Sequence, residues 1–109
     1  MAYEVSERDF EARVIERSRE VPVVVDFWAA WCAPCRMAAP EVAKTAKEMA
    51  GRALVLKVDT ESHPDLAARF GVQGIPNFVV LKDGERVAQQ AGLVSSARMQ
   101  EWLRAAGSG

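Results

Sequence analysis

The stretch that decides the fold is Val23–Arg36, which reads VVVDFWAAWCAPCR. Its first part, Val23–Trp28, is β-branched and aromatic with no polar alternation, the pattern of a strand covered on both faces in a parallel sheet. Pro34 can open a helix soon afterwards, because the first helical turn does not use the N–H that proline lacks. The sequence therefore predicts a buried strand, a short turn and a helix that starts at the cysteines.

The helix after Pro34 leads into a second strand. We expect Gly51 to end this helix. We expect its apolar face to carry Met37, Val42, Ala46 and Met49. Leu54–Val58 then predicts another buried strand, which completes a β-α-β unit with parallel pairing and a right-handed crossover.

Two further helices are predicted at other places in the chain. Ser6, followed three residues later by Asp9, resembles a capping box and starts an amphipathic helix that ends before Val21. Pro64 can open a further helix, which Gly71 closes. Both helices add to the α/β pattern.

An antiparallel hairpin and a last helix follow. Asp83-Gly84 is a typical hairpin turn, and it separates Phe78–Leu81 from Arg86–Ala88. Ser95 or Ser96 then caps the last helix. The residues of this helix expected to cover the sheet are Met99, Trp102 and Leu103.

The composition is typical of a single domain. The chain has 109 residues, two cysteines and a formal net charge of -1, so it can bury a core without a disulfide framework. Its mixed charges offer no stripe for nucleic acid or anionic membrane, and we recognise no signal peptide or membrane-spanning run. We expect a monomeric, cytoplasmic protein with one domain over residues 1–106 and a flexible tail at 107–109.

Cys32 and Cys35 lie one helical turn apart. At this spacing Cβ atoms are about 5–6 Å apart, so a disulfide can form and open with a small backbone adjustment. The helix N-terminus favours a thiolate at Cys32. Cys35 is expected to be more buried and less acidic, which makes Cys32 the attacking residue and Cys35 the resolving one.

A zinc site and an inert cysteine pair are the alternatives. Zinc takes four ligands, and besides the cysteines the sequence offers only His63, which we expect to face solvent or cap a helix. Inert core cysteines have no reason to flank a proline at a helix start. We therefore expect no metal.

Two charged residues interrupt the predicted strands. Asp26 lies inside an apolar run, where an unpaired carboxylate is unfavourable, and Lys57 lies between Leu56 and Val58. Each could instead lie at a strand end and reach water, Lys57 through its flexible stem. The residues alone leave both interpretations open.

Together these motifs resemble the thioredoxin family over roughly Val5 to Leu103. The residues that carry the resemblance are Asp26–Arg36, Pro40, Lys57, Gly74–Pro76, Asp83-Gly84 and Gly92. The resemblance implies an α/β thioredoxin fold, with a central mixed β-sheet flanked by four helices. It also implies a general protein dithiol-disulfide oxidoreductase that needs no cofactor beyond a reversible Cys32–Cys35 disulfide.

The resemblance also implies roles for individual residues. Asp26 would lie below the dithiol, with a pKa raised by burial and partly opposed by Lys57, and would exchange a proton with Cys35. Pro76 would form a cis peptide beside the dithiol. The substrate would bind around Cys32, at Trp31, Ala33, Pro34, Gly74, Ile75, Gly92 and Leu93.

The implied partners are disulfide-containing proteins and a thioredoxin reductase, either flavin-containing or ferredoxin-linked. Ala33 and Asn77 depart from the commonest pattern of the family, which has Gly and Thr there, so the redox potential and partner preference stay open. A thioredoxin-like binding or scaffold module with incidental redox activity is the alternative function. A thiol oxidant or isomerase would normally have an export signal and a polar or His residue between the cysteines.

Overall fold

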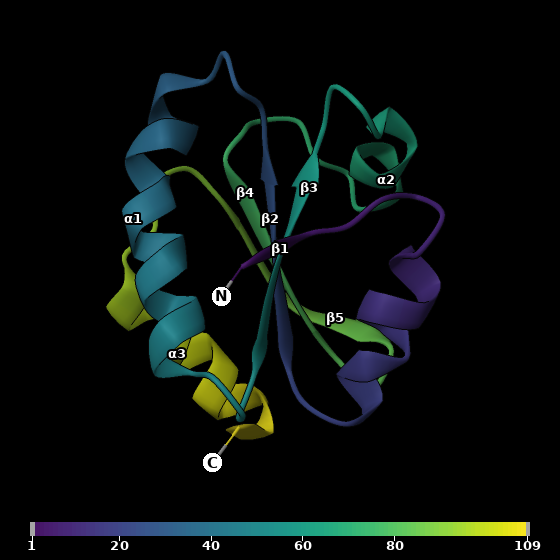
Figure 1. Ribbon diagram of the computed structural model, residues 1–109, viewed down its shortest axis with the longest axis vertical. Coiled ribbons are helices and arrows are strands. Elements are labelled where there is room, and N and C mark those ends of the chain that lie inside the picture. The colour runs from purple at the N-terminus through teal and green to yellow at the C-terminus, as the bar shows by residue number, and fades with distance from the viewer. Residues whose placement is uncertain (1, 109) are drawn as a thin grey trace.

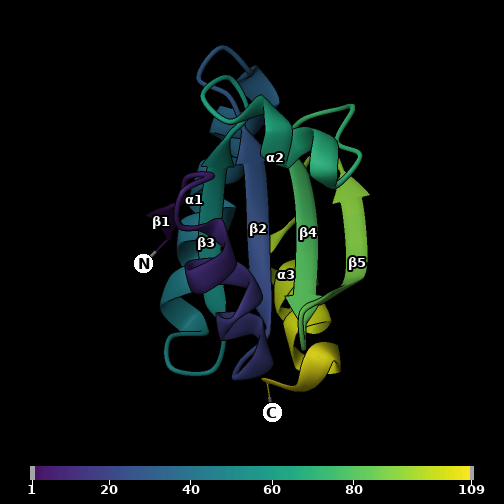
Figure 2. The same ribbon diagram turned by 90° about the vertical axis from the view of Figure 1, so that its right-hand side faces the viewer.

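The computed structural model describes residues 2–108, and within them the strands form one mixed sheet (Figures 1 and 2). The strand order is β1-β3-β2-β4-β5. The strands are β1 (Tyr3–Glu4), β2 (Val23–Trp28), β3 (Leu54–Asp59), β4 (Asn77–Lys82) and β5 (Glu85–Ala91). β3 pairs in parallel with β1 and β2, whereas β4 pairs antiparallel with β2 and β5. The predicted mixed sheet is confirmed, and β1 is an addition to the prediction.

Helices cover both faces of the sheet, which Figure 1 shows nearly edge-on. One face carries α1 (Ala33–Glu48) and α3 (Ser96–Leu103), which runs into a last helical turn at Arg104–Ser108. The other carries α2 (Pro64–Arg69) and the N-terminal helical segment, formed by turns at Glu11–Ile15 and Arg17–Arg19. Within residues 2–108 these are the four helical regions that the resemblance implied.

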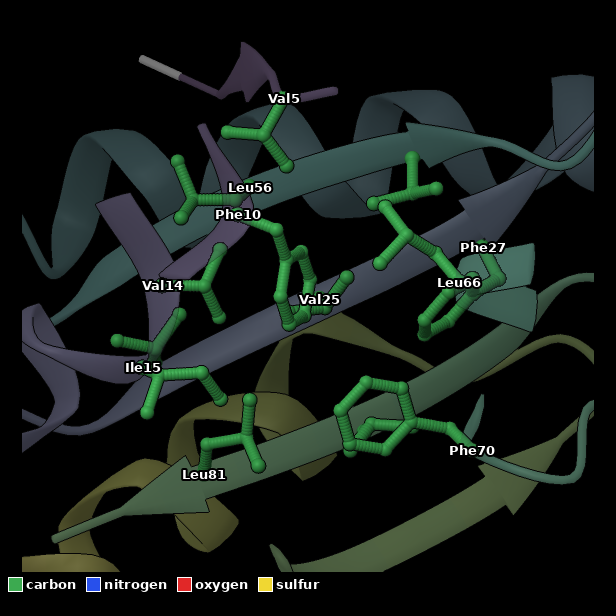
Figure 3. Close-up of a cluster of buried hydrophobic side chains, with 13 residues drawn as sticks. Val5, Phe10, Val14, Ile15, Val25, Phe27, Leu56, Leu66, Phe70 and Leu81 are labelled. Carbon is green, nitrogen blue, oxygen red and sulfur yellow. The ribbon is translucent and has the colours of Figure 1, made fainter. Parts of the chain in front are cut away.

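The face under α2 and the N-terminal segment carries a cluster of buried apolar side chains (Figure 3). Its aromatic centre is Phe70, whose ring centroid lies 5.7 Å from that of Phe10 and 5.8 Å from that of Phe27. Buried aliphatic side chains complete this cluster, including Val5, Val14, Val23, Val25, Leu56, Val58, Leu66 and Leu81. Tilted aromatic pairs at these distances add stability beyond the area they bury.

The face under α1 and α3 has a second core. Its buried residues include Val24, Ala38, Val42, Ala46, Met49, Val55, Phe78, Met99 and Leu103. Because side chains alternate along a strand, Asp26 and Trp28 lie on the same face as Val24. The polar part of β2 is therefore on the face that α1 covers.

The predicted apolar face of α1 is wrong at one position. Met37 is 64% exposed, whereas Val42 and Ala46 are buried as predicted. Met37 comes two residues after the inward-facing Cys35, and two residues make just over half a turn of an α-helix. Its side chain therefore points away from the sheet. Trp102, predicted to cover the sheet, is only half-buried.

Turns and caps follow the sequence signals. Ser95 Oγ accepts a hydrogen bond from the Arg98 N–H at 3.1 Å, which caps α3. Asp83 and Gly84 form the hairpin turn between β4 and β5, with φ values of 54° and 80°. Positive φ at both central residues is what a two-residue hairpin turn needs.

The predicted domain limit lies in the last helical turn of the chain. Gly107 has φ 110° within the last helical turn, and Gly109 and Met1 lie outside the described residues. The boundary after residue 106 remains a prediction. No helix in the described part of the chain is long and apolar enough to cross a membrane.

Candidate active site

The cysteine pair lies where β2 leads into α1. Cys32 is the N-cap of α1, in extended backbone with φ -88° and ψ 108°, and Pro34 occupies the first helical turn. Cys32 and Cys35 form a disulfide with Cα atoms 5.2 Å apart. A cap residue followed by one turn of helix thus brings the two sulfurs together, as the sequence predicts.

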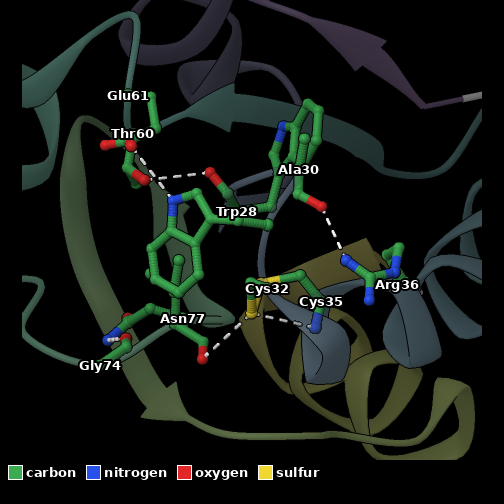
Figure 4. The surroundings of a disulfide bond; sticks show 11 residues. Trp28, Ala30, Cys32, Cys35, Arg36, Thr60, Glu61, Gly74 and Asn77 are labelled. Atoms are coloured by element: carbon green, nitrogen blue, oxygen red, sulfur yellow. Dashed lines mark hydrogen bonds between the residues drawn. A yellow bond between two sulfur atoms is a disulfide. The ribbon is translucent and has the colours of Figure 1, made fainter.

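Backbone groups surround the sulfur of Cys32 (Figure 4). The Cys35 N–H donates to Cys32 Sγ at 3.2 Å, and the Ile75 carbonyl oxygen lies 3.6 Å from the same sulfur. An N–H at a helix N-terminus stabilises negative charge, so this geometry lowers the free energy of a thiolate at Cys32.

The expected difference in burial between the cysteines is wrong. Cys32 is 3% exposed and Cys35 is 5% exposed, so neither is the more buried one in the disulfide form. The reason is that Cys32 packs in a small apolar cluster with Ala29, and Trp28 and Ile75 pack against this cluster. The asymmetry between the two sulfurs lies in their hydrogen bonds.

Side chains outside the motif fix the loop before the cysteines. The Arg36 guanidinium donates to the Ala30 carbonyl oxygen at 2.7 Å. Thr60 donates to the Trp28 carbonyl oxygen with its N–H at 2.9 Å and its hydroxyl at 3.1 Å. Thr60 could not be assigned from the sequence, because a single threonine after a strand carries no signal of its own.

The loop that contains Pro76 is held in a similar way. The Ile75–Pro76 peptide is cis, as the resemblance implied, and the Gly92 N–H donates to the Pro76 carbonyl oxygen at 2.8 Å. Asn77, which replaces the common Thr, donates to the Gly74 carbonyl oxygen at 3.2 Å and accepts from the Gln89 amide at 3.0 Å. Its buried side chain therefore joins this loop to β5.

Asp26 lies in the middle of β2 and is 3% exposed, which excludes the strand-end interpretation. Burial raises its pKa to about 7; Lys57 opposes this rise and Glu4 adds to it. Among the residues described, no group hydrogen-bonds to Asp26 Oδ1. The carboxyl can therefore gain or lose a proton near neutral pH.

Lys57 is half-buried beside Trp28. Its ammonium lies 4.6 Å from the Trp28 ring centroid and 3.8 Å from Glu4 Oε2. The other Glu4 oxygen, Oε1, accepts a hydrogen bond from Trp28 Nε1 at 3.3 Å. Glu4 could not be assigned from the sequence, because a two-residue strand is too short to show a periodic pattern.

The residues expected to bind substrate differ in exposure. Trp31 is 66% exposed and Leu93 is 51% exposed, and the Trp31 indole N–H donates to Glu61 Oε1 at 3.1 Å. The other exposed members of the set are Ala33, Pro34 and Gly74, whereas Ile75 and Gly92 are half-buried and Pro76 is buried.

His63 begins α2 but makes no side-chain cap. Its Nδ1 lies 3.4 Å from Glu7 Oε1, so it takes part in a surface contact. Within the part of the chain that the structure describes, no three metal-ligating side chains come together.

Comparisons with known proteins agree with this geometry. The Thioredoxin family model matches residues 1–105. Thioredoxin 1 of Chlorobaculum tepidum is 47% identical over 92 residues, which cover 84% of this chain and 91% of the relative. Thioredoxin 1 of Synechococcus elongatus is 39% identical over 103 residues, 94% of each chain. The thioredoxin of Rickettsia bellii is 34% identical over 103 residues, 94% of this chain and 96% of the relative. The chain therefore belongs to the thioredoxin family, and Cys32 and Cys35 are its centre of dithiol-disulfide exchange.

Proposed function

We propose that the chain acts as a general reductant of protein disulfides, with Cys32 as its nucleophile. The observation that carries the proposal is the hydrogen bond from the Cys35 N–H to Cys32 Sγ at 3.2 Å, at the N-terminus of α1. It favours negative charge on the sulfur that must attack. The proposal covers the direction of the reaction and the role of each residue.

The reaction consists of two thiol-disulfide exchanges. The Cys32 thiolate attacks one sulfur of the substrate disulfide, forms a mixed disulfide and releases the other substrate sulfur as a thiolate. The Cys35 thiolate then attacks Cys32 Sγ, which forms the Cys32–Cys35 disulfide and releases the second substrate thiolate. The dithiol loses two electrons and two protons, and the substrate gains them.

Asp26 would take the proton from Cys35 in the second step. A carboxyl with its pKa raised to about 7 is half-ionised near neutral pH, so it can accept a proton and return it to solvent. Lys57 would moderate this pKa, because its ammonium favours the ionised carboxylate. Pro76 would shape the loop whose Ile75 carbonyl lies beside Cys32 Sγ.

Substrates would bind to the surface around Cys32. Its exposed apolar residues, Trp31, Pro34 and Leu93, suit an apolar segment of a partner protein. The backbone of Gly74, Ile75 and Gly92 would bind an extended substrate chain, because the Ile75 carbonyl oxygen lies beside Cys32 Sγ and the Gly92 N–H bonds to the same loop at Pro76.

The remaining parts of the proposal concern the cellular setting. A thioredoxin reductase, flavin-containing or ferredoxin-linked, would return two electrons to the disulfide. The cysteine pair would need no metal or organic cofactor. We expect a monomer in the cytoplasm, where reducing conditions keep thiols available.

The test is capture of substrates by single cysteine variants. Cys35→Ser leaves Cys32 able to attack but removes the resolving thiol, so mixed disulfides with protein substrates should accumulate through Cys32. Cys32→Ser is the matched control and should capture none. Equal capture by both variants would refute the assigned roles.

Insulin reduction and the reduction potential test the direction of the reaction. The parent should reduce insulin when a reductase supplies electrons, with a reduction potential of roughly -270 mV. A reduction potential of roughly -120 mV would identify an oxidant instead. No insulin reduction, together with no capture by Cys35→Ser, would favour the scaffold function.

A further inference from the structure

Glu4, Lys57 and Asp26 lie in one row across three neighbouring strands. Glu4 of β1 is paired with Lys57 of β3, and Lys57 is paired with Asp26 of β2. Residues in such a row point to the same face of the sheet. Lys57 therefore stands in this row between two acidic residues, Glu4 on the edge strand and the buried Asp26.

Lys57 is in contact with the outer carboxylate. Its Nζ lies 3.8 Å from Glu4 Oε2 and above the Trp28 ring, while Asp26 Oδ1 has no hydrogen-bond partner among residues 2–108. Glu4 is held in place in turn, because its Oε1 accepts the Trp28 indole N–H. The two oxygens of Glu4 thus fix Lys57 and Trp28 together at the sheet edge.

We infer that Glu4 is a positioning residue for Asp26, because it holds the Lys57 ammonium at the sheet edge and leaves the buried carboxyl without a bonded cation. The inference rests on the proposed function for its importance in turnover. Glu4 lies outside the dithiol loops and would control proton transfer at Asp26 through the position of Lys57.

Few charged groups influence the pKa of Asp26. Across the described residues, the charged groups that shift its pKa are Lys57 from β3 and Glu4 from β1. β4 places Phe78 beside it. The helices that cover this face bury one titratable residue, Cys35; the other buried residues are Ala38, Val42, Thr45 and Ala46 in α1 and Ser96, Met99, Gln100 and Leu103 in α3. Cys35 titrates only when reduced, so the disulfide form isolates the effect of Glu4 and Lys57.

The test measures the pKa of Asp26 in the Glu4→Gln variant. A pH titration of the disulfide form is monitored by NMR of the side-chain carboxyl group. Glutamine keeps the size of the side chain and an oxygen that can accept the hydrogen bond from the Trp28 indole N–H. It removes the negative charge that holds the Lys57 ammonium. The freed ammonium then favours the Asp26 carboxylate, so the Asp26 pKa should fall by roughly half a unit to one unit. An unchanged or higher pKa would overturn the inference.

Lys57→Gln supplies the second variant and a double-mutant cycle. This change alone should raise the Asp26 pKa, because the opposing cation is lost. In the Lys57→Gln background, Glu4→Gln should lower the Asp26 pKa clearly less than in the parent. Only the direct electrostatic effect of the Glu4 charge on Asp26 is then removed. Equal falls in both backgrounds would show that Glu4 does not act through Lys57, which would also overturn the inference.

Glu11→Gln is the matched control. Glu11 is exposed and pairs with Arg69 on the opposite face of the sheet, so the same loss of charge there should leave the Asp26 pKa unchanged. Insulin reduction as a function of pH separates the inference from the proposed function. A shifted Asp26 pKa with an unshifted activity profile would keep the positioning role of Glu4 and remove the proton-acceptor role of Asp26.

Discussion

Alternate residues of β2 lie in two different environments. Val23, Val25 and Phe27 face an apolar cluster that includes the aromatic rings of Phe10 and Phe70. On the other face, Val24 also lies in an apolar cluster, but the next residues are the buried carboxyl of Asp26 and the half-buried indole of Trp28. One face of this strand thus stabilises the fold, whereas the other buries an ionisable group, which costs stability when the group is charged.

Removing an aromatic ring from the apolar face should have the largest effect. Phe27→Ala leaves a cavity next to Phe70 and should lower the free energy of unfolding by about 3–5 kcal/mol. Urea unfolding measures this loss, and insulin reduction below the unfolding midpoint should stay close to the parent's rate per folded molecule. If the alanine variant does not fold, Phe27→Leu should show a smaller loss of the same kind. A loss of activity without a loss of stability would contradict the division between the faces.

Removing the carboxylate of Asp26, on the opposite face of β2 from Phe27, should have the opposite effect on stability. Asp26→Asn should raise the free energy of unfolding by roughly 2–4 kcal/mol at neutral to mildly alkaline pH, while insulin reduction slows. Lys57 keeps Glu4 as a partner, so the variant leaves no new buried cation unpaired. A variant that is less stable than the parent at neutral pH and fully active would contradict both assignments.

The pH dependence of this gain has a definite sign. The folded protein holds the Asp26 proton up to about pH 7, whereas the unfolded chain releases it near the ordinary value of 3.8. Between these two values the folded state binds more protons, so the stability of the parent falls as pH rises. The advantage of Asp26→Asn should therefore grow across this window and level off above it, as urea midpoints at several pH values would show.

Removing a buried hydroxyl from the side of the sheet that carries Phe27 should have a smaller effect on stability. Ser18 is fully buried; its hydroxyl donates to the Ile15 carbonyl oxygen at 2.6 Å and accepts the Gly84 N–H at 2.9 Å. Ser18→Ala leaves both groups unpaired and should lower stability by about 1–3 kcal/mol. Chemical denaturation measures the change, and amide exchange at Gly84 should become faster. Unchanged exchange there would show that the hydroxyl does not hold the hairpin turn.

The smallest effect on stability is expected at Met37, on the exposed side of α1. Met37→Ala removes an exposed side chain and should change stability by less than about 0.5 kcal/mol, whereas Met49→Ala, at a fully buried position, should cost about 2–5 kcal/mol. Thermal unfolding of the two variants checks the correction made to the predicted face of α1. Similar losses in both would restore the original prediction.

Local signals were sufficient for most of the fold. Val23–Trp28, Pro34 and the Asp83-Gly84 turn each carry a strong local preference, and the corresponding strand, helix and hairpin were confirmed. Met37 was assigned to the wrong side of its helix, because methionine is apolar in any position and the sequence does not fix where the helical face begins. β1 was missed because two residues are too few to show a period.

For a related reason, the sequence predicts some residues of the site and not others. The cysteines and Asp26 stand out because their chemistry conflicts with their neighbours in sequence. Glu4, Thr60 and Gln89 act through contacts with residues far away in the chain, and nothing local distinguishes them from ordinary surface residues. Similar burial of Cys32 and Cys35 depends on a loop from another part of the chain, so their spacing could not reveal it.

The two loops beside the disulfide have a consequence for partner binding. Thr60 and Arg36 fix the loop before Cys32, and Asn77 and Gln89 fix the loop that contains Pro76. A surface that is already ordered loses little conformational entropy when a partner arrives, so a small apolar contact is enough for binding. Such a contact also has a short residence time, because affinity among related complexes is set mainly by dissociation. Preorganisation would then let one dithiol serve many unrelated proteins in rapid succession.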